Sequence, residues 1–218
     1  IGSVFAGTLL AIPLGILSAI KQYTWIDSLV LVFSMLAVSI PSFWFALMCL
    51  SLFSVELGLL PAIYDGSLGS WIMPVLVIAL ASMSGLTRIT RSSMLEVIRS
   101  DYIRTARAKG QTEWNIVIRH AFRNALIPIL AAIGNSLGAQ LGGALIIETI
   151  FGMPGIGKYI TDAISQRNFP AVQGGVILLA FTFTIVNLLV DLSYTFVDPR
   201  LKGTIITAPK QKKKTAAV

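Results

Sequence analysis

The chain alternates between long uncharged runs and short polar segments. A helix rises 1.5 Å per residue, so about 20 apolar residues cross the ~30 Å hydrocarbon core of a membrane. Five runs approach or exceed this length, at residues 1–20, 29–57, 71–87, 125–147 and 174–197. The pattern therefore predicts an all-α polytopic membrane protein with five visible transmembrane helices.

Composition supports this prediction and excludes several classes of protein. The chain is 55% hydrophobic and 12% charged, whereas soluble domains carry about 25% charged residues. The single histidine, His120, excludes a metal site built from several histidines, and the single cysteine, Cys49, allows no internal disulfide. His-Glu-x-x-His and Gly-x-Ser-x-Gly signatures are absent from the sequence. We therefore expect neither a catalytic residue nor a metal site, and no cofactor bound by this chain.

The basic residues are sorted by loop. Of the 17 Lys and Arg residues, 15 lie in the turn at Lys21, in residues 88–123 or in the tail 198–218, and the others are Lys158 and Arg167. Five spans place those three segments on one face, and an excess of Lys and Arg marks the cytoplasmic side. The net charge of +7 thus indicates topology and not a nucleic-acid partner. We expect the C-terminus, including a basic tail at 203–218, to be cytoplasmic.

One polar stretch, within residues 88–124, is too long to be a simple turn. Ser100 or Asp101 is expected to cap a helix with its side-chain oxygen, Gly110 stands where a left-handed residue ends a helix, and Thr112 is expected to cap a second, amphipathic segment. Helix, glycine stop and helix on the cytoplasmic face predict a structured docking element. The alternative is a solvated charged linker.

Small and polar residues within the spans predict a packed bundle. Gly7, Ala11 and Gly15 recur every four residues, and such stripes let helix backbones approach closely. The fourth span carries a similar stripe at Gly134, Gly138 and Gly142. The spans also contain four polar residues, Asn135, Gln140, Asn187 and Asp191. Polar side chains at membrane depth face the bundle or a cavity, so these four either line a pathway or join helices by hydrogen bonds.

A stretch from Gly152 to Lys158 has the spacing of a phosphate-binding loop. Tyr159 stands where that motif requires Ser or Thr to bind Mg²⁺, no soluble α/β unit surrounds the motif, and the predicted topology places it outside the cell. We interpret it instead as a glycine-rich turn before a short interfacial helix.

Four segments resemble a known family. The stretch 101–110, Asp-Tyr-Ile-Arg-Thr-Ala-Arg-Ala-Lys-Gly, and the stretch 119–128 resemble the coupling loop of permease subunits of ATP-binding-cassette importers. The broad family has Glu-Ala-Ala-x-x-x-Gly there. The version with Arg104 and Thr105 resembles the dipeptide, oligopeptide and nickel subclass. Residues 148–157 and 190–200 are similar to the first of the two permeases in peptide systems.

The resemblance implies a permease domain over residues 1–202, with six spans in the family and one before Ile1. It implies a coupling helix that enters a cleft of the ATPase, formed with its neighbours by Asp101, Tyr102, Arg104, Thr105, Ala106, Arg107, Ala108, Lys109, Gly110, His120 and Asn124. It also implies a second homologous permease, two ATPase subunits that use ATP and Mg²⁺, an extracytoplasmic solute-binding protein, and a bacterial or archaeal inner membrane. Peptide is the expected substrate, with nickel or another small solute as the alternative. A gradient-driven transporter or channel and a lipid-binding scaffold are further alternatives.

Overall fold

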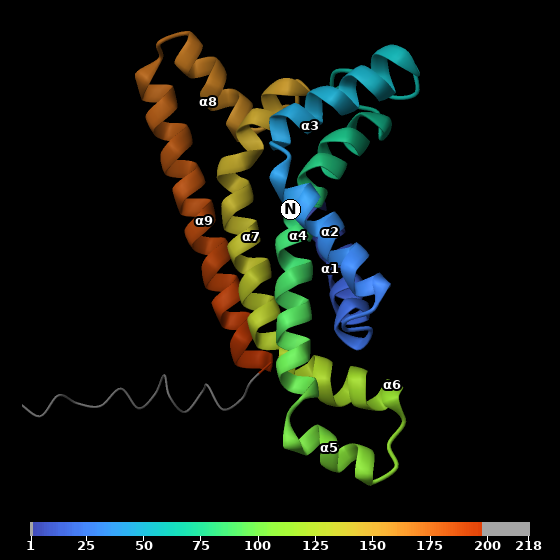
Figure 1. Ribbon diagram of the computed structural model, residues 1–218. Coiled ribbons are helices and arrows are strands. Elements are labelled where there is room, and N and C mark those ends of the chain that lie inside the picture. The colour runs from blue at the N-terminus through green and yellow to red at the C-terminus, as the bar shows by residue number, and fades with distance from the viewer. Residues whose placement is uncertain (1, 198–218) are drawn as a thin grey trace, which may run out of the picture.

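The computed structural model describes residues 2–197, apart from the side chains of residues 141–143 and 194–197. Every regular element in this part of the chain is helical, as the sequence predicted. The long helices α4 (Gly69–Ile98), α7 (Arg123–Ile150) and α9 (Phe169–Val197) lie next to one another in that order. Helices α1 (Gly2–Ile20) and α2 (Trp25–Ser39) pack on α4, on the side away from α9 (Figure 1).

The short helices gather at the two ends of this bundle. At one end lie α5 (Asp101–Ala108), α6 (Glu113–Asn115) and the π-helix η2 (Ile116–Phe122), and we call this the α5 end (Figure 1). At the other, which we call the α8 end, lie α3 (Ser42–Cys49), the π-helix η1 (Leu50–Glu56) and α8 (Ile156–Ser165). One core cluster surrounds Met94, Ile103 and Ile116 near the α5 end, and another surrounds Met73, Ile147 and Phe151 near the α8 end.

Four helical stretches of the described residues are long and apolar enough to cross a membrane. A fifth candidate is the pair formed by α2 and the helical segment Ser42–Glu56, if the two together make one bent span. That pair bends by 95°. The residue before a proline is driven out of the helical region, and Ile40 before Pro41 is extended, with φ −87° and ψ 122°. The apolar run at 29–57 is therefore two helices in different directions, which its hydropathy alone does not reveal.

Helix α4 is longer than the third apolar run. That run ends at Thr87, yet the helix continues to Ile98. Thr90, Ser93 and Met94 remain buried while Arg88 and Glu96 are exposed, so this part of the helix has a buried face and an exposed charged face. The polar stretch that follows the third span accordingly begins as a helix and not as a loop.

The contact between α1 and α4 is close because α1 carries small residues there. A Cβ atom placed on Gly7 would lie 2.8 Å from the carbonyl oxygen of Ala79, and one placed on Gly15 would lie 2.6 Å from Thr90 Cβ. Ala11, between the two glycines, is fully buried. The stripe with four-residue spacing thus faces α4. The basic tail at 203–218 lies outside the described residues.

Candidate docking element and polar path

Helix α5 ends in a Schellman motif, which satisfies its last carbonyl groups. Gly110 has φ +75°, a left-handed conformation that glycine adopts without steric cost. Its N–H donates to the carbonyl of Arg107 at 2.9 Å, and the N–H of Gln111 donates to the carbonyl of Ala106 at 3.3 Å. The glycine stop predicted from the sequence is present and turns the chain toward α6.

Of the two helix N-caps predicted from the sequence, only one is formed by a side chain. Thr112 caps α6, where its side chain accepts a long hydrogen bond of 3.5 Å from the N–H of Asn115. Ser100 occupies the N-cap position of α5, but its hydroxyl donates backward to the carbonyl of Val97 at 2.6 Å. Neither Ser100 nor Asp101 caps α5 through its side chain, so that part of the prediction is wrong. The hydroxyl of Ser100 instead satisfies a carbonyl at the end of α4.

One side of α5 anchors it to the bundle. Ile103 is fully buried and belongs to the core cluster that contains Met94, Ile116 and Val117. Ala106, one turn later, is half-buried and packs against the same cluster. Arg107 ties α5 to α6, because its guanidinium donates to both carboxylate oxygens of Glu113 at 2.8 and 3.2 Å. This pairing raises the pKa of Arg107.

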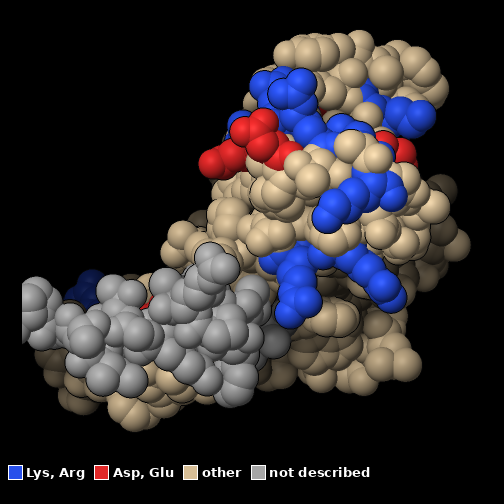
Figure 2. Space-filling model, turned by 90° about the horizontal axis from the view of Figure 1, so that it is seen from below, with Lys and Arg blue, Asp and Glu red and all other residues tan. Residues whose placement is uncertain are grey.

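The opposite side of α5 faces outward. Asp101, Arg104, Thr105 and Ala108 are all exposed and recur at helical spacing. Tyr102 and Lys109 are exposed beside them. Figure 2, which views the molecule from the α5 end, shows Lys and Arg side chains spread across this surface. The element offers a partner a basic, outward face on a rigid base.

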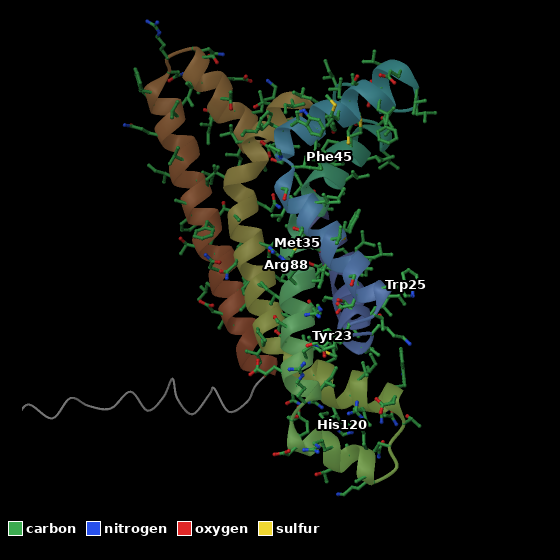
Figure 3. All side chains as sticks on the ribbon, viewed as in Figure 1. Tyr23, Trp25, Met35, Phe45, Arg88 and His120 are labelled. Atoms are coloured by element: carbon green, nitrogen blue, oxygen red, sulfur yellow. The ribbon has the colours of Figure 1, made fainter. Side chains whose placement is uncertain are left out.

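His120 lies in η2 at the base of this element (Figure 3), and Asn124 follows in the first turn of α7. The amide of Asn124 donates to the backbone carbonyl of His120 at 2.6 Å. The structure brings these two residues together, but it does not place them on the outer face of α5.

The predicted pathway residues are not brought to one place. Gln140 lines a cavity between α1, α4, α7 and α9, and its amide donates to Ser82 Oγ at 2.6 Å. Asn187 is half-buried on α9, whereas Asn135 and Asp191 are exposed on this single chain. Gln140 therefore both lines a cavity and joins α7 to α4.

The glycines of α7 face α9. A Cβ atom on Gly134 would lie 2.5 Å from Val190 Cγ1, and one on Gly138 would overlap the ring of Phe183. The surroundings of Gly142 lie outside the described side chains.

Sequence reasoning missed a buried ion pair near the α5 end. Asp27, 3% exposed, accepts two hydrogen bonds from the guanidinium of Arg91 at 2.7 and 2.8 Å. It also accepts from the hydroxyl of Ser18 at 2.5 Å and from the N–H of Tyr23 at 3.0 Å. The pair joins the first turn of α2 to α4. Opposite charges at the same ends of neighbouring spans are the only signal of it in the sequence.

The glycine-rich turn before α8 receives a carboxylate from the same chain. Glu148 Oε2 accepts a hydrogen bond of 3.1 Å from the N–H of Lys158, in the first turn of α8. A Cβ atom on Gly155 would overlap this carboxylate, and one on Gly157 would lie 2.7 Å from it. A helix N-terminus attracts anions, and here Glu148 supplies the anion.

A comparison with protein families decides what the bundle is. Residues 11–203 match the model of the binding-protein-dependent transport system inner membrane component. The chain belongs to this family. The family resemblance seen in residues 101–110 and 119–128 is thereby confirmed.

Relatives of this permease are peptide transport proteins. The chain is 40% identical to the dipeptide transport system permease protein DppB of Alkalihalophilus pseudofirmus, over 89% of the chain and 67% of the relative. It is 39% identical to DppB of Escherichia coli K12 over the same shares, and 43% identical to a putative peptide transport system permease of Brucella abortus over 88% and 63%. The chain thus spans about two thirds of the length of these relatives.

A solved structure supports the fold. An amino acid ABC transporter, crystallised with histidines, superposes with a TM-score of 0.60 at 16% identity, covering 91% of this chain and 88% of that one. The helical arrangement is therefore that of an ABC transporter permease.

Proposed function

We propose that this chain is a membrane-spanning permease subunit of an ATP-driven, binding-protein-dependent importer of di- or oligopeptides. The observation that carries the proposal is the identity of 39–43% to dipeptide and peptide permeases along nearly nine tenths of the chain. The chain forms half of the pathway, and a second homologous permease forms the other half.

The exposed face of α5 supports a coupling role. Two ATPase subunits bind and hydrolyse ATP with Mg²⁺ on the cytoplasmic side, and α5 sits in a cleft of one of them. Ile103 and the Arg107–Glu113 pair hold α5 to α6 and to the end of α4. Movement of the cleft is therefore transmitted to α4 and α7 as a displacement of one rigid element.

The distribution of Lys and Arg residues supports an orientation of the chain in the membrane. The α5 end is cytoplasmic because it carries most of the Lys and Arg residues, and the C-terminus lies on that side. The α8 end is extracytoplasmic, where a solute-binding protein delivers substrate near residues 58–70 and 148–173.

The test is reconstitution with the partner subunits in proteoliposomes. We expect the ATPase subunits to co-purify with the chain, and uptake of labelled di- and oligopeptides to require ATP and the binding protein. Competition by Ni²⁺ instead of peptide would assign a nickel importer. Uptake by the chain without ATPase subunits would refute the proposal in favour of a gradient-driven transporter.

A further inference from the structure

One carboxylate at the α8 end has no cationic partner. Glu148 is half-buried near the end of α7. Among the described residues it forms no salt bridge. The nearest base along the chain, Lys158, pairs through Nζ with Asp162 at 2.7 Å. The N–H of Lys158 reaches only one of the two carboxylate oxygens of Glu148, which leaves the other open to a ligand.

Two adjoining cavities meet at this carboxylate. Ser3, Ile78, Ala144 and Glu148 line both of them. Gln140 and Thr182 also line the first cavity, whose remaining walls are apolar. A half-buried carboxylate beside apolar walls is costly unless a cation or hydrogen-bond donors accompany it.

The polar groups around the first cavity are mostly hydrogen-bond acceptors. The amide nitrogen of Gln140 donates to Ser82 Oγ and to the carbonyl of Ile78, and its carbonyl oxygen accepts from none of the described residues. The hydroxyl of Thr182 donates to the carbonyl of Leu178 at 2.8 Å and retains its lone pairs. A primary ammonium has three donors and no acceptor, and thus complements the carboxylate of Glu148 on a cavity that otherwise offers acceptor oxygens.

We propose that Glu148 binds the primary ammonium group of the transported substrate at the α8 end of the pathway. This inference rests on the proposed function, because a peptide with a free N-terminus carries such a group. It goes further in naming the chemical group that the permease itself recognises.

The test uses Glu148→Gln in the assembled transporter, with the binding protein and ATPase subunits present. Glutamine keeps an oxygen for the N–H of Lys158 and removes only the charge. Glu56→Gln is the matched control, since Glu56 is exposed at the same end of the molecule. Loss of a charge-assisted hydrogen bond is expected to lower the maximal uptake rate of a labelled dipeptide about tenfold or more in E148Q. Uptake by E56Q and the affinity of the binding protein are expected to stay unchanged.

A second measurement separates ligand binding from a structural role. A dipeptide with a diazirine on its N-terminal residue is expected to label α7 between Gln140 and Glu148 in the wild type, and to lose that label in E148Q. Equal uptake by E148Q and E56Q, or labelling that persists in E148Q, would overturn the inference. Absence of dipeptide uptake by the wild type would instead refute the proposed function.

Discussion

At the scale of single residues, the glycines before α8 are explained by what approaches them. Gly152 has φ +63°, and Gly155 and Gly157 leave space for Glu148 and for the backbone at Leu145. The spacing resembles that of a phosphate-binding loop because both arrangements open backbone N–H groups to an anion. Sequence alone excluded a nucleotide but did not identify the carboxylate that takes its place.

Replacing Gly157 by alanine should therefore destabilise the chain. The new Cβ would lie 2.5 Å from the Cα of Leu145, and neither backbone can yield easily. We expect a loss of about 1–3 kcal/mol, typical of overpacking, measured by thermal unfolding in detergent. Gly174→Ala is the control, because nothing lies within 4 Å of its Cβ position. Equal unfolding temperatures for the two variants would contradict this packing.

The Asp27–Arg91 pair makes a second prediction at this scale. Arg91→Met would leave the buried carboxylate of Asp27 without its charge partner. Such a loss costs about 3–5 kcal/mol and should appear as a lower unfolding temperature in detergent. Arg88→Met, one turn earlier on the exposed side of α4, should change it little. A double variant with Asp27→Asn should recover part of the loss, and failure to recover any would argue against direct coupling.

Opposite charges at the same ends of neighbouring spans do not by themselves pair Asp27 with Arg91, which stand 64 positions apart. Their pairing depends on how α1 and α2 fold back against α4, and only the packed bundle specifies it. Gly110 was predictable, by contrast, because the requirement for a left-handed residue after a helix is local.

At the scale of elements, hydropathy located the apolar runs but not the residues at which the helices begin and end. The third apolar run ends at Thr87, whereas α4 continues to Ile98. Hydropathy reports contact with lipid or core, and a helix that leaves the membrane keeps its backbone hydrogen bonds while its exposed face becomes charged. For the second apolar run, hydropathy predicts one helix where the structure has two. Pro41 divides the run without lowering its hydropathy.

The end of α5 allows a test of coupling at this scale. A left-handed conformation costs an ordinary residue about 1–2 kcal/mol, and a β-branched residue suits it worst. Gly110→Val should therefore shift α5 and uncouple ATP hydrolysis from peptide uptake, while membrane insertion stays intact. No other atom lies within 4 Å of the Cβ position, so backbone strain is the only expected cause.

Gly110→Asn is the matched control, because asparagine tolerates the left-handed conformation. We expect the ratio of transported peptide to hydrolysed ATP to fall in the valine variant and to be largely retained in the asparagine variant. Wild-type uptake in Gly110→Val would refute the coupling role of α5.

At the scale of the whole molecule, the two ends are built for different tasks. The α5 end carries an outward basic helix fixed by Ile103 on a core that includes residues of α4. The α8 end carries a glycine-rich turn, a half-buried carboxylate and cavities between helices. Helices α4 and α7 run between these ends, so in the proposed function they are the elements that would carry a displacement of α5 to the cavities.

This division requires that the two ends lie on opposite sides of the membrane. With the buried Cys49 replaced by serine, single cysteines at Lys109 and Ser165 would report each end, since both positions are exposed. A membrane-impermeant maleimide should label Ser165→Cys in intact cells. It should label Lys109→Cys only after the membrane is opened, because the orientation proposed from the Lys and Arg excess puts the α5 end in the cytoplasm. Labelling of Lys109→Cys in intact cells would reverse the orientation and would place α5 where no ATPase could reach it.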